Sequence, residues 1–225
     1  MYIRPLLIGI NPQLNLVSST EYLFVVMCNP VGSYAGTKAL TSVNAAVCRD
    51  FDRAAPNGTG SYKLSANYAG SFHSYNIAHH AGYQEILFLD PATKTKIDEF
   101  GSSNFFAIKG NSYITPLSDS VLPSITNKSL QQIAEDRGMT IEKRVVPFEE
   151  LETFEEVNAC GTAVVITPIY SITDKPSLAS PEVIREYRFA EQGDAGPVSS
   201  ELYHRIRAIQ NGEAEDIHNW CVEPY

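Results

Sequence analysis

Residues 59–69 read Thr-Gly-Ser-Tyr-Lys-Leu-Ser-Ala-Asn-Tyr-Ala, with a lysine, Lys63, between a glycine-containing approach and an Asn-Tyr pair. Turn-forming residues at 56–60 predict a loop before the lysine, and residues 67–82 predict a helix after it. A lone lysine is most often a solvated surface charge. Lys63 therefore becomes a candidate for chemistry only through the motifs that accompany it.

Further motifs follow this lysine in order along the chain. They are Tyr68, a Glu-x-Gly-x-x-Asn stretch at 99–104, Leu-Pro-Ser-Ile-Thr at 122–126 and Cys-Gly-Thr-Ala at 160–163. The ordered set resembles the pyridoxal-phosphate pocket of the branched-chain aminotransferases, which are fold-type IV transaminases. The resemblance covers nearly the whole chain, from Tyr-Ile-Arg-Pro at 2–5 to Asp-Ile-His-Asn-Trp at 216–220.

Composition bounds the class of protein. A chain of 225 residues with 44% hydrophobic residues is long enough to bury a sizeable core, and a net charge of -9 argues against nucleic acids and anionic membranes as partners. No run of 18 apolar residues is present, and the first residues do not resemble a signal peptide. The four cysteines lack C-x-x-C spacing, as expected of reduced thiols. We therefore expect a cytoplasmic location.

Apolar runs and turn signals predict the secondary structure. Strands are expected at 22–28, 43–49, 85–90, 104–109, 113–115, 141–146 and 163–168. Helices are expected at 67–82, from Ser124 or Thr126 to Arg137, near 148–153 and at 199–211. The continuous apolar runs at 22–28 and 85–90 indicate buried strands, the first of them buried on both faces. Because strands and helices intermix without a regular βαβ period, the sequence favours an α+β fold over a doubly wound sheet.

The resemblance implies the large cofactor domain of the fold-type IV pyridoxal-phosphate enzymes, a mixed sheet or pseudo-barrel with flanking helices, plus a remnant of a small domain. It assigns 1–32 to the remnant of the N-terminal small domain, 33–38 to the interdomain loop and 39–225 to the PLP-binding large domain. In the family, the rest of the small domain comes first and supplies an arginine for the cofactor phosphate. We therefore expect a truncated chain with apolar surface that lacks its cover, which favours oligomerisation.

The resemblance makes Lys63 the catalytic residue. Its amine would join the cofactor aldehyde and then move a proton to and from the substrate as general base and acid. Tyr68 resembles the tyrosine that hydrogen-bonds the cofactor's 3′-oxygen, and Glu99 resembles the carboxylate that keeps the pyridine nitrogen protonated. Ser102 stands where the family often has a threonine or a glycine. Without the other motifs, Tyr68 would be an ordinary packed tyrosine and Glu99 part of a solvated turn.

Phosphate binding is expected at two segments. Ile125 and Thr126 lie at a predicted helix start, where unpaired backbone N–H groups stabilise an anion, and Thr162 lies in a Gly-Thr-Ala turn. Ser124 and Asn127 depart from the glycine and arginine that many relatives show in this segment. The expected phosphate donors are backbone N–H groups, so these departures do not remove them. Each segment alone would be an ordinary capped helix or an ordinary turn.

Substrate binding is expected at Tyr2, Arg4 and Ala163. Tyr2 and Arg4 resemble the family's strand that approaches the amino acid, and an arginine can hold a carboxylate with two parallel hydrogen bonds. Ala163 resembles a residue whose backbone N–H contacts the substrate carboxylate. A frayed N-terminus is the structural alternative for the first two residues.

Other polar clusters favour plain structural explanations. The histidines at 73, 79 and 80 lack carboxylates at metal-binding spacing, so no metal site is expected. The acidic residues between 149 and 156 are expected to form a solvated helix surface, and residues 173–195 an exposed loop.

The resemblance implies a homodimeric enzyme that transfers the amino group of leucine, isoleucine or valine to 2-oxoglutarate with pyridoxal 5'-phosphate. One alternative is a PLP enzyme of the D-amino-acid aminotransferase or aminodeoxychorismate lyase type, which the Tyr-Ile-Arg-Pro and Gly-Thr-Ala motifs disfavour. Another is a truncated, non-catalytic remnant that serves as a dimerisation or structural module. The expected partners are small amino acids and 2-oxo acids, with no nucleic acid and no membrane.

Overall fold

The computed structural model describes residues 1–32 and 40–222. The chain divides into two compact units, Met1–Thr37 and Lys38–Tyr225, each of which is described by itself. The interdomain loop expected at 33–38 lies outside the described residues. The assignment of 1–32 to a small-domain remnant stays a prediction.

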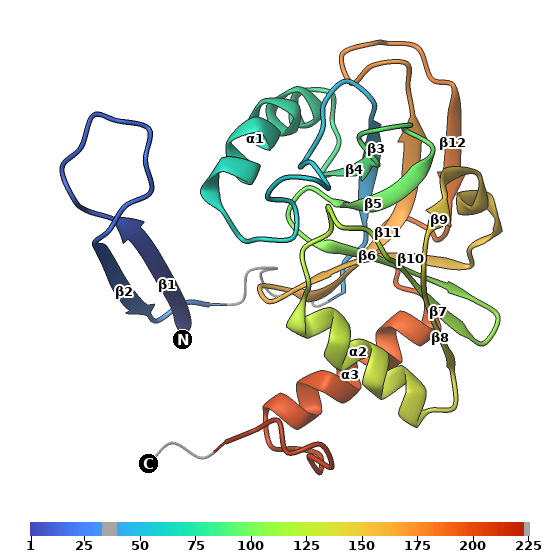
Figure 1. Ribbon diagram of the computed structural model, residues 1–225. Helices are drawn as coiled ribbons and strands as arrows, with labels where there is room; N and C mark the ends of the chain where they lie inside the picture. The colour runs from blue at the N-terminus through green and yellow to red at the C-terminus, as the bar shows by residue number, and fades with distance from the viewer. Residues whose placement is uncertain (33–39, 223–225) are drawn as a thin grey trace. The chain divides into compact units, whose positions relative to one another are not determined.

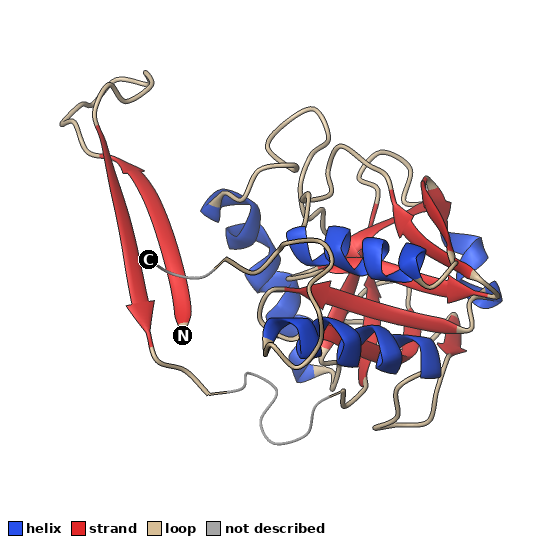
Figure 2. Ribbon diagram, turned by 90° about the horizontal axis from the view of Figure 1, so that it is seen from below, coloured by secondary structure: helices blue, strands red, loops and turns tan. Residues whose placement is uncertain are grey.

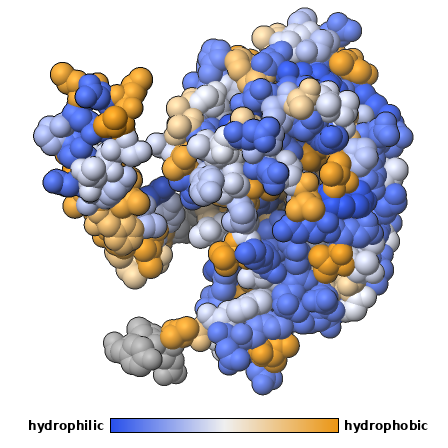
Figure 3. Space-filling view, in the orientation of Figure 1, coloured by the Kyte–Doolittle hydropathy of each residue, from blue (hydrophilic) through white to orange (hydrophobic). Residues whose placement is uncertain are grey.

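The first unit is a two-stranded antiparallel sheet of β1 (Tyr2–Gly9) and β2 (Tyr22–Asn29). The sequence of β2, Tyr-Leu-Phe-Val-Val-Met-Cys-Asn, is a continuous apolar run, yet all but one of its residues are exposed. The prediction that this strand is buried on both faces is therefore wrong. Among residues 1–32 the structure describes only these strands and their connections, so no layer of this unit covers either face. Figure 3 shows the hydrophobic side chains of this unit at its surface.

The second unit contains the remaining strands and helices (Figure 1). They are β3 (Val43–Cys48), α1 (Ser65–His80), β4 (Glu85–Leu89), β5 (Lys96–Phe100), β6 (Asn104–Lys109), β7 (Ser112–Pro116), α2 (Ile125–Asp136), β8 (Thr140–Arg144), β9 (Val146–Pro147), the 3-10 helix η1 (Phe148–Thr153), β10 (Glu156–Gly161), β11 (Val165–Asp174), β12 (Arg185–Arg188) and α3 (Pro197–Gln210).

Six of these strands close into a barrel in the order β6-β10-β11-β3-β4-β5, because β5 also pairs with β6. The β3 strand runs parallel to both of its neighbours, and the other barrel pairings are antiparallel. The pair that closes the barrel is Glu99 opposite Asn104, the first and last residues of the Glu-x-Gly-x-x-Asn motif. The predicted α+β fold with a mixed, barrel-like sheet is confirmed.

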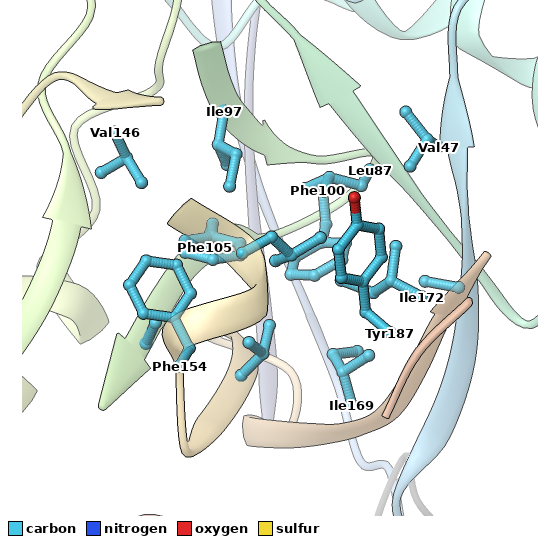
Figure 4. Close-up of a cluster of buried hydrophobic side chains, with 14 of the residues drawn as sticks. Val47, Leu87, Ile97, Phe100, Phe105, Val146, Phe154, Ile169, Ile172 and Tyr187 are labelled. Atoms are coloured by element: carbon cyan, nitrogen blue, oxygen red, sulfur yellow. The ribbon is translucent and has the colours of Figure 1, made fainter. Parts of the chain in front are cut away.

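Alternating side chains of the strands build two layers of core. Phe105 and Ala107 of β6 belong to the cluster inside the barrel, together with Phe100 and Val157. Figure 4 shows Phe100 and Phe105 in this cluster. Phe106 of the same strand points outward and belongs to a second cluster beneath α2 and α3. Figure 2 shows the helices lying against the outside of the sheet. The barrel thus has a filled interior, and the polar groups of a site have to lie at its ends or edges.

Three strands were not expected from the sequence. In β5, the sequence Lys-Ile-Asp-Glu-Phe carries two carboxyl groups, and β10 and β12 also lack a long apolar run. Within the loop expected at 173–195 lie β12 and the fully buried Leu178. The acidic residues at 149–156 are not all solvated, because the Glu156 carboxylate is buried and accepts the backbone N–H of Ser199 at 2.8 Å. This carboxylate satisfies the start of α3, where a helix leaves N–H groups unpaired.

Candidate active site

The loop that carries Lys63 is held by Asn67 in the first turn of α1. Asn67 Nδ2 donates to the backbone oxygens of Thr59 at 2.7 Å and Tyr62 at 2.9 Å. Its Oδ1 accepts a hydrogen bond from Thr59 Oγ1 at 2.8 Å. The side chain is buried, so these bonds fix the backbone immediately before the lysine. Asn67 was not among the predicted site residues, although its place next to Tyr68 was a signal for it.

Lys63 and Tyr68 contact each other, and the role expected for Tyr68 at the cofactor stays a prediction. Lys63 Nζ donates to the Tyr68 hydroxyl at 2.9 Å and lies 5.1 Å from the centroid of its ring. The lysine side chain is exposed in this chain. The hydrogen bond to Tyr68 therefore restrains the direction of the Lys63 amine, although the lysine side chain is exposed to solvent.

Glu99 lies at the closing pair of the barrel and is only 3% exposed. Asn104 Nδ2 donates to its Oε2 at 2.9 Å, and the backbone N–H of Leu122 donates to its Oε1 at 3.1 Å. Burial raises the pKa of Glu99 to about 7, whereas the charge of Arg53 and the Leu122 N–H act to lower it. The charge of Lys63 also lowers this pKa, as the smallest of these effects.

Arg53 is the partner of Glu99 that sequence reasoning missed. Its Nη2 lies 2.7 Å from Glu99 Oε1 and donates to the backbone oxygens of Gly60 at 3.1 Å and of Ser120. One buried guanidinium therefore joins the loop before Lys63, strand β5 and the loop that leads to α2. The Gly60 backbone approaches Ser120 so closely that a Cβ there would lie 2.6 Å from the Ser120 Cα. No pattern in the sequence distinguishes Arg53 from a surface arginine.

The start of α2 leaves backbone donors for an anion. Ser124 caps the helix, with its hydroxyl accepting the N–H of Asn127 at 3.1 Å. The N–H groups of Ile125 and Thr126 belong to the first turn and have no acceptor within the helix. Leu122, a few residues earlier, binds Glu99, so the same segment connects the buried carboxyl group to the helix start.

Thr162 and Ala163 lie in the exposed turn between β10 and β11. Cys160 pairs with Asn104 across the sheet, which places this end of β10 beside the closing pair of the barrel. Burial, and to a smaller extent the charge of Glu99, raise the pKa of the Cys160 thiol well above its usual value. The turn is conformationally restricted, because the β-branched Val165 has a φ of 66°.

The other predicted residues are Ser102, in the connection between β5 and β6, and two residues of the first unit. The Ser102 hydroxyl is exposed and accepts a hydrogen bond from the Tyr75 hydroxyl at 3.4 Å. In the first unit, Arg4 Nη2 donates to the Tyr2 hydroxyl at 2.6 Å. The roles expected for Ser102, Tyr2 and Arg4 stay predictions.

Metal-binding clusters and membrane-spanning helices are both absent from the described residues. In 1–32 and 40–222, no group of three or more His, Cys, Asp or Glu side chains is placed to hold a metal ion. No helix in the described part of the chain is long and apolar enough to cross a membrane.

The known proteins that are similar in sequence to this chain are aminotransferases. Residues 2–172 match the family described as amino-transferase class IV. The branched-chain-amino-acid aminotransferase of Helicobacter pylori is 39% identical over 232 residues, which cover 99% of this chain and 63% of the relative. The enzyme of the same name from Haemophilus influenzae is 39% identical over 230 residues, 99% of this chain and 64% of the relative. The chain thus spans less than two thirds of the length of these two relatives.

Solved structures give the same grouping. The branched-chain amino acid aminotransferase of Escherichia coli superposes with a TM-score of 0.75 at 29% identity, over 97% of this chain and 68% of that chain. The enzyme from Thermobaculum terrenum in its PLP form has a TM-score of 0.77 at 27% identity, over 97% of this chain and 66% of that chain. The resemblance seen in the motifs is therefore confirmed in sequence and in fold.

Proposed function

The chain belongs to the class IV aminotransferases, and from that premise we propose that it transfers amino groups from leucine, isoleucine or valine to 2-oxoglutarate with pyridoxal 5'-phosphate. The observation that supports the proposal is an accessible amine, Lys63, with the Tyr68 hydroxyl at 2.9 Å, in a barrel whose closing pair contains the buried acid Glu99. Lys63 and Glu99 come from segments far apart in the sequence, and the charge of the first lowers the pKa of the second. The proposal concerns the activity of a whole enzyme, whereas this chain spans less than two thirds of the length of the two relatives.

The residues present fit the cofactor. Pyridoxal phosphate requires an amine for its aldehyde, an acid for its ring nitrogen and donors for its phosphate. Lys63 would supply the amine, Glu99 the acid, and the backbone N–H groups of Ile125 and Thr126 the donors, with Thr162 as a further phosphate contact. The cofactor, when bound, supplies an electron sink for the pair of electrons left when the substrate Cα loses its proton.

Glu99 is suited to hold a cation in place. Asn104 and Leu122 each donate to a different carboxylate oxygen, so the carboxyl group cannot rotate without losing a hydrogen bond. Its pKa of about 7 means that a further positive charge beside it fixes the ionised form at neutral pH. The ring nitrogen of the cofactor would be that charge.

Lys63 would move the proton at the substrate Cα. A general base must be neutral when it accepts a proton, and the nearby hydroxyl of Tyr68 at 2.9 Å keeps the amine in one direction. The exposed position of Lys63 gives a bound substrate direct access to the amine. In this proposal, Tyr2, Arg4 and Ala163 bind the substrate, and Arg4 takes a carboxylate with its planar guanidinium.

The experiment is the covalent labelling of one lysine. The purified chain is mixed with pyridoxal phosphate, reduced with borohydride and digested, and the modified peptide is identified by mass spectrometry. We expect the label on Lys63 and its loss in Lys63→Ala, with Lys96→Ala, at an exposed lysine of β5, as the matched control. A label that is spread over several lysines, or that persists in Lys63→Ala, contradicts the proposal.

A non-catalytic remnant is the second candidate function, and the exposed apolar strands of the first unit favour it. In that case the chain acts as a dimerisation module, and it takes the label on Lys63 without turning over leucine. Transamination of leucine by the purified chain excludes this candidate. The expected homodimer and cytoplasmic location stay predictions.

A further inference from the structure

A cavity outside the proposed active site lies between the second half of α1 and the segment 175–181. Its volume is about 530 Å³. Helix α1 contributes His73, Ile77 and His80 to its wall, and the opposite wall includes Lys175 and Leu178. None of the predicted cofactor or substrate residues lines this cavity.

Lys175 is the charged group of the wall on this side, and no anion pairs with it among the described residues. Its side chain belongs to a residue that is only 6% exposed. Its ammonium lies 5.5 Å from the centroid of the Tyr83 ring, and no hydrogen bond or ion pair joins it to any residue in the described ranges. A ligand anion beside Lys175 would form a charge-assisted contact that no described residue supplies.

The walls are built independently of any ligand. Leu178 is fully buried in the cluster beneath α1, and its backbone N–H donates to Asp50 Oδ2 at 2.9 Å. Asp50 forms no ion pair with Lys175 among the described contacts, so it does not neutralise the lysine. On the helix side, His73 packs edge-on against Phe51 with ring centroids 5.3 Å apart. A ligand would therefore enter a preformed site at little cost in ordering the protein.

The apolar side chains that line the cavity favour a ligand with a hydrocarbon part. Apart from the polar groups, the wall consists of short apolar side chains, namely Ile77, Ala81, Leu178, Ala179 and Pro181. The other polar lining residues are His73, Asn76, His80 and Ser180. A lysine ammonium beside apolar side chains matches a ligand with one negative charge and an apolar tail. We propose that this cavity binds a small monocarboxylate with a hydrocarbon tail, whose carboxylate pairs with Lys175. The site is independent of the cofactor and of the proposed transamination.

The test follows the ring resonances of His73 and His80 by NMR while 3-methylbutanoate is added to the purified chain. The resonances are assigned with His73→Gln and His80→Gln. Two further probes separate the contribution of the negative charge from that of the apolar tail. The alcohol 3-methylbutan-1-ol has the same tail without the charge, and inorganic phosphate has charge without the tail. We expect saturable shifts with the acid, and at least about tenfold weaker binding of both other probes, as expected for the loss of one charge-assisted contact.

Lys175→Met keeps the side-chain stem and removes the charge, and Lys96→Met is the matched control at an exposed lysine. Binding of the acid should weaken at least about tenfold in the first variant and stay unchanged in the second. Ala179→Glu places a carboxylate at the exposed rim, where it would compete for Lys175 without disturbing the core, and should also abolish binding. Equal affinity of the acid in Lys175→Met, equal affinity of the alcohol or phosphate, or no shift at all would each overturn the proposal.

Discussion

Strands β2 and β4 carry the same kind of sequence, and the structure buries one and exposes the other. The β4 sequence, Glu-Ile-Leu-Phe-Leu, lies inside a closed barrel between β3 and β5, with α1 on its outer side. The β2 sequence pairs only with β1 within its unit. Phe88 of β4 is 0% exposed, whereas Phe24 of β2 is 65% exposed. A continuous apolar run therefore predicts that a strand needs cover on both faces, but not that the chain itself provides the cover.

The largest expected difference between the two regions is in thiol reactivity. Cys28 lies at the exposed end of β2, and Cys48 lies fully buried at the end of β3. Burial raises the pKa of Cys48 to about 11, so little thiolate is present near neutral pH. We expect Cys48 to react with a thiol reagent on the order of 10⁴-fold more slowly than Cys28, since it reacts only through an opened state.

The rates are measured by the absorbance of the released chromophore, and the modified cysteines are identified by peptide mass spectrometry. Cys28→Ser should remove one fast-reacting thiol and leave the slow phase unchanged. Similar rates for Cys28 and Cys48 would mean that the barrel opens readily, and the comparison between the two regions would lose its basis.

The next difference is energetic and uses one phenylalanine from each strand. Phe88→Ala removes a fully buried ring from β4 and should lower the free energy of unfolding by about 3–5 kcal/mol. Phe24→Ala removes an exposed ring from β2 and should change it by less than about 0.5 kcal/mol. Both values come from urea unfolding followed by circular dichroism. A large loss in Phe24→Ala would show that β2 is covered in solution, for example in an oligomer.

Sequence reasoning predicted the segments that β3, β4 and β6 occupy because apolar runs bounded by turns identify central strands. It missed β5, whose adjacent carboxyl groups, Asp98 and Glu99, are typical of a solvated turn. Those groups are buried only because Arg53 and Ser120 reach them from other segments, which no local pattern contains. The exposure of β2 was missed for the converse reason, since its pattern requires a covering layer that residues 1–32 do not include.

The candidate site also contains residues that local motifs suggest and residues that only the structure reveals. The motifs made Lys63, Tyr68 and Glu99 candidates because each belongs to a short local pattern, and their roles stay predictions. The residues that hold them, Asn67 and Arg53, act through contacts to backbone oxygens, and such contacts depend on the folded path of the chain. Positioning residues of this kind therefore become visible only in the structure.

The smallest of the three effects concerns a charge that the barrel buries. The pKa of Glu99 is raised from 4.5 to about 7, so between these values the folded chain binds more protons than the unfolded chain. Its contribution to stability is therefore fully present below pH 4.5 and is lost as the pH rises through 7. The rise of this pKa from 4.5 to about 7 corresponds to a decrease in the free energy of unfolding on the order of 3 kcal/mol.

Glu99→Gln should flatten this pH dependence, because glutamine does not titrate. The readout is the slope of the unfolding free energy between pH 5 and 8, measured without cofactor. The absolute stability of the variant is less informative, because the variant leaves the charge of Arg53 without its carboxylate. Burial also raises the pKa of Glu85, which contributes with the same sign in both proteins. Asp98 interacts with Glu99 and with the same Arg53 charge, so part of the change in slope reports on Asp98. Glu21→Gln, at an exposed carboxyl group beside β2, is the matched control and should leave the slope unchanged. If Glu99→Gln keeps the wild-type slope, burial in the barrel does not set the charge state of Glu99, and the difference between the two regions is limited to their apolar side chains.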